Sequence, residues 1–367
     1  MIKRSRQTVN IHQILPNLSF GDAIGNLVFD LQDMFIKWGY KSEIYVQTTD
    51  KRLKNRVFDI HQYDTESCEK TICIYHFSIG SGLADFLKNL KCKKIVINHN
   101  ITPPEYMRGL NDHAEHMIKV GLSELEQIVK FADLVLCDSE YNRQQVADMS
   151  CKNARIFPVV INFDRLKNGY SHVIREILND GHVNILHVGR IVPNKKIEDI
   201  IKVFYYYKNM INNKSSLYLV GQFTKMGVEG YHQRLLEFCD ELGLSDVFFH
   251  GKIDQDELNA YYKFCDVYIS MSEHEGFCVP LIESMYFDLP VMAYDSTAIP
   301  YTLDDSGILL KKKNYSEIAG LIDLIIKDDS FRSKIIKKQR ERIDRYMSYD
   351  FEKTIEGYIE SLDDDKN

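Results

Sequence analysis

Short apolar runs alternate with longer segments of helical periodicity along nearly the whole of this 367-residue chain. The segment 23–38, for example, places Ile24, Leu27, Leu31 and Phe35 three or four residues apart, the spacing of one helix face. Strands that alternate with helices form βαβ units, which assemble into parallel sheets. The pattern therefore predicts an α/β fold. The expected strands are 9–15, 42–46, 71–76, 94–97, 134–137 and 155–160 in the first half, and 183–188, 216–220, 247–249, 266–270 and 290–293 in the second.

The length of the chain favours two domains, since a single hydrophobic core rarely grows beyond about 250–300 residues. Hydrophobic residues make up 44% of the chain and charged residues 27%, which is typical of a soluble globular protein. The segment 162–181 is largely polar and contains no clear strand. We therefore expect a first domain at 1–180 and a second at 181–348.

Composition argues against several classes of protein. A net charge of −7 does not suit a general nucleic-acid binder. The eight cysteines form no Cys-x-x-Cys pair and are expected to be reduced thiols. No apolar stretch is long enough to span a bilayer, and the N-terminus lacks the apolar core of a signal peptide. We expect a cytoplasmic protein, with peripheral contact to the inner membrane surface left open.

Two carboxylates, Glu275 and Glu283, lie eight residues apart at the end of an expected strand. The run 266–270 is the strand, and Pro280 falls in the first turn of the helix that follows. Ligands of open α/β sheets bind at the carboxyl ends of strands. Because a carboxylate accepts two hydrogen bonds from a vicinal diol, this pair suits a sugar or a ribose.

Four segments carry a resemblance to a known family. They are Glu275-x7-Glu283 with the apolar run after it, the basic segment 187–196, the glycine loop 21–26 and the histidine loop 98–103. In this order they are similar to the motifs of retaining glycosyltransferases of family 4, which have the GT-B fold. The resemblance implies two Rossmann-like, doubly wound parallel-sheet domains that face a central cleft. It also implies that the last helix, 349–362, crosses back to complete the N-terminal domain.

The same resemblance implies that the second domain holds a nucleoside diphosphate sugar. Arg190 and Lys195, which follow Gly189, would bind the diphosphate, because a guanidinium, an ammonium and a helix N-terminus all favour anions. Glu283 would accept hydrogen bonds from the ribose, and Glu275 from the transferred sugar. The backbone that would lie beside the sugar and phosphate is that of Gly276, Phe277, Cys278 and Val279.

The sequence departs from the family pattern at two positions of this expected site. Lys196 and Cys278 stand where the family usually or often has Gly. Cys278 is not interpreted as a nucleophile. Glu273, in the same loop, is a second carboxylate that competes with Glu275 for the proposed role.

The resemblance places acceptor-side residues on the first domain. Gly21 and Gly25 would let a ligand approach the backbone closely, Gly21 on the acceptor side and Gly25 beside the donor, and Asp22 between them would orient an acceptor hydroxyl. The alternative is a tight turn with an Asp cap. His99 is expected to face the donor sugar and to act in catalysis. His76 is assigned to the acceptor side, with a structural role as the alternative.

Neither a metal nor a cofactor is expected; the nucleotide sugar is a co-substrate. The Asp-x-Asp pattern of metal-dependent glycosyltransferases occurs at Asp254 and Asp256 and in the acidic tail. The first is interpreted as a helix cap, and the tail does not follow a strand. Arg190 and Lys195 supply the counter-charge for a leaving diphosphate.

The sequence thus predicts a retaining, metal-independent glycosyltransferase that moves a sugar, of the hexose type, onto a hydroxyl of a glycan or lipid-linked acceptor. Surface polysaccharide or lipid-linked glycan assembly is the expected context. A sugar-nucleotide epimerase of the same fold is an alternative, and dependence on an acceptor separates the two. A glycoside hydrolase would leave Arg190 and Lys195 unexplained. A non-catalytic sugar-binding protein is the remaining class.

Overall fold

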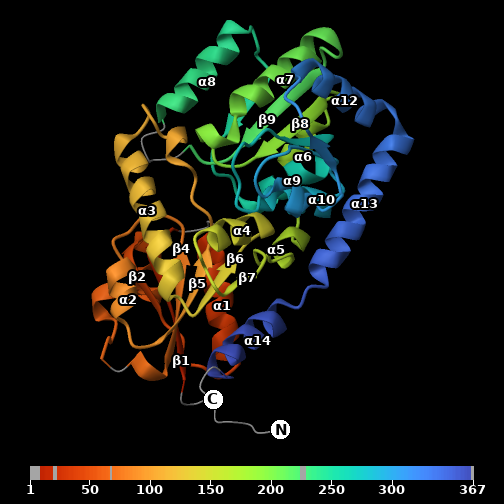
Figure 1. Ribbon diagram of the computed structural model, residues 1–367. Helices are drawn as coiled ribbons and strands as arrows, with labels where there is room; N and C mark the ends of the chain where they lie inside the picture. The colour runs from red at the N-terminus through yellow and green to blue at the C-terminus, as the bar shows by residue number, and fades with distance from the viewer. Residues whose placement is uncertain (1–8, 20–22, 67, 224–228, 365–367) are drawn as a thin grey trace. The chain divides into compact units, whose positions relative to one another are not determined.

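The computed structural model describes residues 9–19, 23–66, 68–223 and 229–364. The chain forms two compact units, which can be followed by colour in Figure 1. The first comprises residues up to 101, 116–161 and the residues from 350 onward, and the second comprises 102–115 and 162–349. Each unit contains one parallel sheet with helices packed on it, so the expected α/β class is confirmed.

The first unit is built on a parallel sheet in the order β3-β2-β1-β4-β5-β6-β7. The chain winds outward from β1 to β3 and then outward in the other direction from β4, so the winding switches between β1 and β4. All six expected strands of this half are present, whereas β3 has two residues and is too short for a hydrophobic pattern. The bounds are β1 (Asn10–Leu18), β2 (Ile44–Thr49), β3 (Phe58–Asp59), β4 (Thr71–Phe77), β5 (Lys93–Asn98), β6 (Leu134–Cys137) and β7 (Ala154–Ile156).

Helices cover this sheet with their apolar faces. Helix α1 buries Leu27, Leu31 and Phe35 in one core with strand residues that include Ile11 and Ile74. Full burial of each such side chain contributes about 1.5–3 kcal/mol relative to exposure. The periodicity seen in the sequence is therefore the inward face of this helix. The helices are α1 (Ala23–Lys37), α2 (Ala84–Asn89), α3 (Asp112–Phe131), α4 (Glu140–Asp148) and α14 (Phe351–Asp364).

The second unit has a parallel sheet in the order β10-β9-β8-β11-β12-β13. Its winding switches between β8 and β11, which are hydrogen-bonded neighbours with Ile185 opposite Val267. Such a switch point opens a ligand crevice at the carboxyl ends of the two strands. The five expected strands are present, and the three-residue β13 is additional. The bounds are β8 (Val183–Val188), β9 (Ser215–Val220), β10 (Val247–His250), β11 (Val267–Ser270), β12 (Val291–Tyr294) and β13 (Ile308–Leu310).

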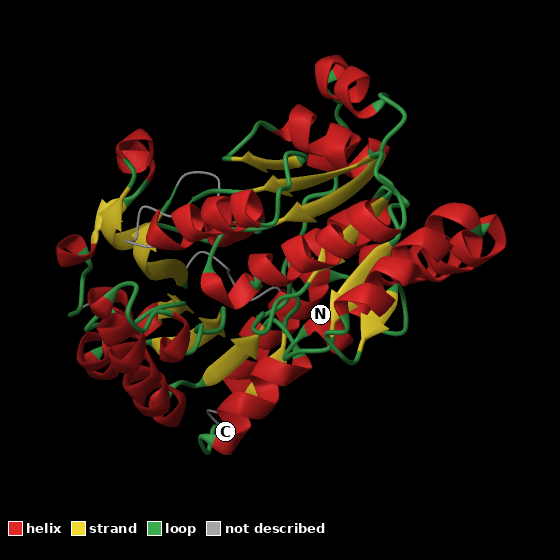
Figure 2. Ribbon diagram, turned by 90° about the horizontal axis from the view of Figure 1, so that it is seen from above, coloured by secondary structure: helices red, strands yellow, loops and turns green. Residues whose placement is uncertain are grey.

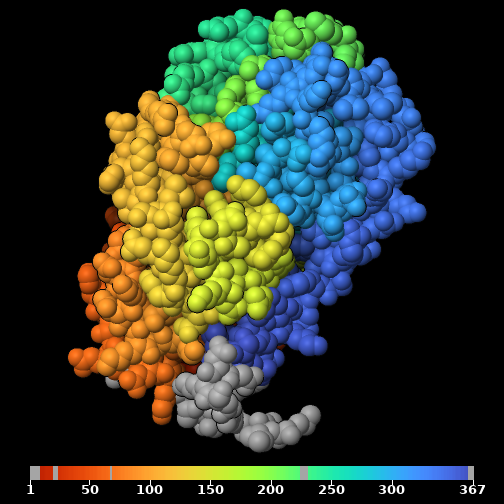
Figure 3. Space-filling model, in the orientation of Figure 1, coloured from red at the N-terminus to blue at the C-terminus, as the bar shows by residue number. Residues whose placement is uncertain are grey.

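Helices lie on both sides of the strands in the second unit, and Figure 2 shows strands in yellow between helices in red. Ile200 and Phe204 of α7 share a core with Leu217, Ile269 and Ile322. The atoms of α12 and α13, blue in Figure 3, form part of the surface of this unit. The helices are α5 (Asp164–Lys167), α6 (His172–Leu178), α7 (Ile197–Met210), α8 (Glu229–Glu241), α9 (Gln255–Phe264), α10 (Val279–Tyr286), α11 (Ile299–Leu303), α12 (Tyr315–Lys327) and α13 (Asp329–Met347).

The division of the chain differs from the expected boundary between 180 and 181. The first unit ends at 161, and residues 162–180 belong to the second. The reason is a set of hydrogen bonds made by Asn259 of α9. Its side-chain nitrogen donates to the carbonyls of Arg165, Asn168 and Gly169 at 2.9–3.3 Å. These hydrogen bonds hold the segment against α9 of the second unit.

Two further segments belong to a different unit from the residues that flank them in the sequence. The excursion 102–115 belongs to the second unit, where Met107 and Leu110 pack against its core. The last helix, α14, belongs to the first unit, where Ile355 and Ile359 are buried. This matches the expected crossing of helix 349–362 onto the N-terminal domain.

Candidate active site

The backbone segment after β8 packs in close contact with the segment after β9. A Cβ atom at Gly221 would lie 1.8 Å from the carbonyl oxygen of Gly189, so only glycine fits at position 221. The chain then passes through the short helix η6 (Pro193–Lys195) into α7. Arg190 and Lys195 are thereby carried between the end of a strand and the start of a helix, as the sequence predicts.

The segment after β11, residues 271–278, is tied to η6 by backbone and side-chain hydrogen bonds. The amide of Glu273 donates to the carbonyl of Asn194 at 2.8 Å, and the Asn194 side chain donates to the carbonyl of His274 at 2.9 Å. On its other side, the amide of Glu275 donates to Thr297 Oγ1 at 2.8 Å. Asn194 and Thr297 hold the loop in place, although no sequence motif singled them out.

Lys195 and Glu275, eighty residues apart, form an ion pair in which Nζ lies 2.5 Å from Oε1. Both side chains are largely buried. Burial acts to raise the pKa of Glu275, but the charge and hydrogen bond of Lys195 and a hydrogen bond from Ser272 outweigh it and lower that pKa. Glu275 is therefore a carboxylate with Lys195 as its counter-ion.

Glu283 has a different environment on α10. Tyr262, which is fully buried, donates its hydroxyl to Oε2 of Glu283 at 2.7 Å. Burial of the carboxyl group raises the pKa of Glu283, and the hydrogen bond from Tyr262 only partly offsets this. The two glutamates of the motif are thus electrostatically distinct, which the spacing did not reveal.

Arg190 is exposed, and within the described part of the chain its side chain forms no hydrogen bond or ion pair. Its guanidinium is consequently available to an anion. By contrast, Glu273 is occupied by two lysines, with Lys313 Nζ at 2.7 Å and Lys196 Nζ at 3.3 Å. The competing carboxylate of the loop is therefore paired with Lys313 and Lys196, and Glu275 is the one that lies beside Lys195.

The two positions at which the family pattern has glycine both have left-handed backbone conformations. Lys196 has φ 51° and Cys278 has φ 73°. Glycine adopts this region without steric cost, whereas other residues are strained there by about 1–2 kcal/mol. Burial, reinforced by the charge of Glu275, raises the pKa of the Cys278 thiol. The thiol is therefore neutral at pH 7, consistent with its not being a nucleophile.

His187, at the end of β8, was not assigned a role from the sequence. Its Nδ1 donates to the carbonyl of Ile269 at 2.9 Å, and the side chain is buried. Burial lowers the pKa of His187 to about 4. The ring is therefore neutral, and it positions the ends of β8 and β11 without adding charge. A polar residue inside an apolar strand was the only sequence signal for it.

In the first unit, His76 and His99 contact each other directly. His76 Nδ1 lies 3.0 Å from His99 Nε2, and His76 Nε2 lies 2.9 Å from Oε1 of Gln13. On its other side, His99 Nδ1 lies 3.4 Å from Asp138 Oδ2.

Gly25 is a buried residue of α1, whereas Gly21 and Asp22 lie outside the described residues.

The Asp-x-Asp segment is a helix cap, as interpreted from the sequence. Asp254 accepts a hydrogen bond from the amide of Glu257, and Glu257 returns one to the amide of Asp254. No cluster of three His, Cys, Asp or Glu side chains suited to a metal ion occurs among the described residues. In the same part of the chain, no helix combines the length and apolar character needed to cross a bilayer.

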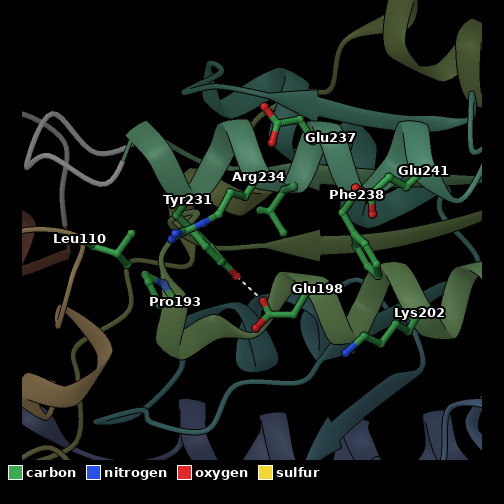
Figure 4. Close-up of a pocket in the computed structure, with 10 residues that line it drawn as sticks. Leu110, Pro193, Glu198, Lys202, Tyr231, Arg234, Glu237, Phe238 and Glu241 are labelled. Carbon is green, nitrogen blue, oxygen red and sulfur yellow. Dashed lines mark hydrogen bonds between the residues drawn. The ribbon is translucent and has the colours of Figure 1, made fainter.

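One pocket of about 520 Å³ lies between α7 and α8 of the second unit (Figure 4). Tyr231 donates to Oε2 of Glu198 at 2.5 Å within it. Acidic, basic and apolar side chains are mixed along its walls, and it contains none of the residues expected to bind the donor. The lining residues are Leu110, Pro193, Glu198, Lys202, Tyr231, Arg234, Leu235, Glu237, Phe238 and Glu241.

The model of the family described as "Glycosyl transferases group 1" matches residues 174–342, which lie within the second unit. The ion pair Lys195–Glu275, Arg190 and Glu283 all fall inside the matched residues.

Curated relatives are similar at low identity. The serotype-specific mannosyltransferase WbdA of Escherichia coli is 22% identical over 270 residues, which are 71% of this chain and 30% of the relative. The O-antigen chain mannosyltransferase B of Escherichia coli is 21% identical over 253 residues, which are 63% of this chain and 60% of the relative. The chain therefore spans only about a third to three fifths of the length of these two relatives.

Solved structures agree with the fold. Anabaena HepE in complex with UDP-glucose has a TM-score of 0.72 to this chain at 16% identity, covering 95% of this chain and 99% of HepE. The two parallel sheets wound in the order described above are those of the GT-B glycosyltransferase fold. The expected fold class is confirmed over nearly the entire chain.

Proposed function

We propose that this protein is a glycosyltransferase that moves a sugar from a nucleoside diphosphate sugar to an acceptor hydroxyl with retention of anomeric configuration. The observation that carries the proposal is the Lys195–Glu275 ion pair at the switch point between β8 and β11. Arg190, exposed and without a side-chain partner among the described residues, lies five residues earlier in the same segment. Cationic groups beside a sugar-binding carboxylate suit a nucleotide sugar better than a simple sugar.

The chemistry follows from the charge that develops as the glycosidic bond breaks. The transition state is oxocarbenium-like, and negative charge grows on the departing diphosphate. Lys195 has three N–H donors, of which Glu275 occupies one, so its remaining N–H groups can bind phosphate oxygens. Arg190 can add a bidentate contact. Stabilising this charge is the main electrostatic contribution that we assign to the protein.

In this proposal the two glutamates bind different parts of the donor. Glu275, charged and held by Lys195, accepts hydrogen bonds from the transferred sugar. Glu283 accepts hydrogen bonds from the ribose, because only Oε2 is engaged by Tyr262 among the described residues. HepE is a precedent for a UDP-sugar on this fold. The mannosyltransferase relatives support hexosyl transfer in O-antigen or related surface polysaccharide assembly.

Metal independence is part of the proposal, since Arg190 and Lys195 replace the divalent ion as counter-charge for the diphosphate. Transfer should survive excess EDTA. Complete loss that Mg²⁺ or Mn²⁺ restores would contradict this part and would direct attention to carboxylates outside the described residues.

The experiment that tests the proposal begins with thermal denaturation in the presence of UDP-, GDP- and ADP-sugars. A donor at about a hundred times its dissociation constant adds about 2.7 kcal/mol to the free energy of unfolding. Release of nucleoside diphosphate is then measured with glycan and lipid-linked acceptors. Release that requires an acceptor supports transfer, whereas epimerisation of the sugar without an acceptor would assign the protein to the epimerases.

Two variants test the diphosphate contacts. Arg190→Ala and Lys195→Ala should each lower kcat/KM about a hundredfold or more, as loss of one transition-state donor typically does. Arg340→Ala is the matched control, because Arg340, on α13, is exposed and its ion-pair partner is Asp288. Full activity in both site variants would show that the diphosphate binds elsewhere.

A further inference from the structure

Four side chains of the first unit form one continuous line of hydrogen-bonding contacts. Gln13 lies on β1, His76 on β4, His99 directly after β5 and Asp138 directly after β6. The N···O and N···N distances along the line are 2.9 Å from Gln13 to His76, 3.0 Å from His76 to His99 and 3.4 Å from His99 to Asp138. These four strands are neighbours in the sheet, in the order β1-β4-β5-β6.

The Gln13 end of this line determines which atom donates in the hydrogen bonds that follow. The Gln13 amide nitrogen donates to the carbonyl of Val28 at 2.9 Å, and a carbonyl can only accept. The amide oxygen of Gln13 therefore faces His76 Nε2, which must carry a proton and donate. Rotating the amide by 180° would place its oxygen against the Val28 carbonyl, so this orientation is the only one that satisfies both contacts.

The protonation of His76 in turn determines which nitrogen of His99 donates. Burial holds the pKa of His76 well below its usual value. A neutral His76 with its proton on Nε2 has an unprotonated Nδ1, which can only accept a hydrogen bond. His99 Nε2 must therefore carry a proton and donate to it.

The second nitrogen of His99, Nδ1, then faces Asp138. If His99 were neutral, Nδ1 would be an acceptor facing another acceptor in a buried place. A proton on Nδ1 would satisfy both the ring nitrogen and the carboxylate oxygen. The side chains of His99 and Asp138 are 5% and 6% exposed, and Oδ1 of Asp138 has no hydrogen-bond partner among the described residues. A buried carboxylate of this kind requires a nearby positive charge.

We propose that His99 is a permanent imidazolium, held between Asp138 and His76, and that Gln13, His76 and Asp138 are its positioning residues. Among the described residues, His76 and Asp138 are the titratable groups that contact the His99 ring. Both ring nitrogens of His99 are then engaged within the protein. The residue acts through a fixed positive charge at the carboxyl edge of the sheet, and not by donating a ring N–H to a sugar.

A role for this charge in turnover rests on the proposed function, since a fixed cation suits an anionic group such as the phosphate of a lipid-linked acceptor. The protonation state itself does not rest on it. Structure and activity can therefore be tested separately.

Nuclear magnetic resonance of the full chain labelled with ¹⁵N-histidine tests the protonation state. The wild-type protein at pH 8 should show one histidine ring with both nitrogens protonated, and an N–N coupling across the hydrogen bond should link that ring to a neutral histidine. His99→Asn should remove this signal. In Asp138→Asn the doubly protonated ring should be absent at pH 8. The control is His61→Asn, which replaces an exposed histidine and should leave the doubly protonated ring unchanged.

Two results would overturn the proposal. One is a wild-type spectrum at pH 8 in which every histidine ring has an unprotonated nitrogen. The other is a doubly protonated ring that persists unchanged in Asp138→Asn. The wild-type spectrum and its N–N coupling decide the question even if a variant fails to fold.

Kinetics give the second arm of the test. In Asp138→Asn, the ratio of kcat at pH 6 to kcat at pH 8 should rise severalfold relative to wild type, because a ring without its carboxylate partner no longer keeps its positive charge at the higher pH. A ratio equal to that of wild type would refute a role for the charge in turnover. If no donor is turned over at all, the proposed function fails, and the spectra still decide the charge.

Discussion

At the scale of single residues, the same type of side chain acquires different properties within eight positions of the chain. Glu275 is paired with Lys195, and the pKa of Glu275 is lowered. Glu283 is hydrogen-bonded to Tyr262, and burial raises the pKa of Glu283. One carboxylate belongs to a charged pair and the other to a neutral contact. This difference favours separate roles in binding a donor.

Substitution of each glutamate by alanine should separate these roles. Glu283→Ala should weaken binding of the free nucleoside diphosphate by about 1–3 kcal/mol, because ribose hydroxyls lose their acceptor. Glu275→Ala should leave that binding nearly intact and reduce transfer. Calorimetric titration with the diphosphate and with the intact donor measures both effects. Equal losses of diphosphate affinity in the two variants would refute the division, and retained transfer in Glu275→Ala would count against the whole mechanism.

A second prediction concerns His187 and the pH dependence of stability. Its pKa is about 4 in the folded protein and about 6.5 when unfolded, because burial disfavours the charged form. The unfolded state thus binds a proton first as the pH falls. The stabilisation is complete above pH 6.5 and declines toward pH 4, by about 2 kcal/mol between pH 7 and pH 5.

His187→Asn keeps a side-chain donor but cannot titrate. Urea denaturation followed by circular dichroism at pH 7 and pH 5 should therefore show a smaller loss of stability for this variant than for wild type. His182→Asn is the control, since His182 is only partly buried. The same loss in His187→Asn as in wild type would contradict the prediction.

At the scale of elements, glycines act in opposite ways in different places. Gly221 allows the segments after β8 and β9 to touch, because a Cβ would overlap the Gly189 carbonyl. Gly320 is exposed inside α12, and a Cβ there would meet no atom within 4 Å. The first glycine is required by close approach, whereas the second only lowers helix propensity.

Alanine at the two positions should therefore have opposite effects on stability. Gly221→Ala should destabilise the second unit by more than about 1 kcal/mol and weaken donor binding, since Gly189 must move and Arg190 with it. Gly320→Ala should stabilise by about 0.5–1 kcal/mol without changing donor affinity. Thermal denaturation and donor titration measure both. A Gly221→Ala variant as stable as wild type would show that the two segments can separate freely.

At the scale of the whole molecule, each unit is assembled from segments that are distant in the chain. The first unit is completed by α14, whose buried residues Ile355 and Ile359 share a core with Ile11 of β1. Its stability therefore depends on the last residues of the chain, and a fragment that ends before 350 lacks part of a hydrophobic core.

This dependence can be measured with neighbouring substitutions in α14. Ile359→Ala should destabilise the first unit by about 2–5 kcal/mol, because it removes buried methyl groups and leaves a cavity. Glu360→Ala changes an exposed neighbour and should stay within about 0.5 kcal/mol of wild type. Trp38, which packs against this core, reports the transition of the first unit by fluorescence. Equal stability of the two variants would show that α14 is dispensable.

The sequence by itself determined the elements and the positions of the motifs. Apolar periodicity is a local property, so β8 was predicted with its observed bounds and α1 ended within one residue of the prediction. The Asp254 cap was also predicted, because its partner Glu257 is three residues away. Very short strands such as β3 and β13 were missed, since two or three residues carry no period.

Only the tertiary structure decided what depends on residues far apart in the chain. In the folded chain, Glu275 forms an ion pair with Lys195, eighty residues away, and Glu273 forms one with Lys313. The tertiary structure moved the boundary to 161, because Asn259 binds carbonyls about ninety residues earlier. It also placed His99 next to Asp138. Charge, burial and hydrogen-bond direction are set by neighbours in space, and one sequence specifies those neighbours only through the complete fold.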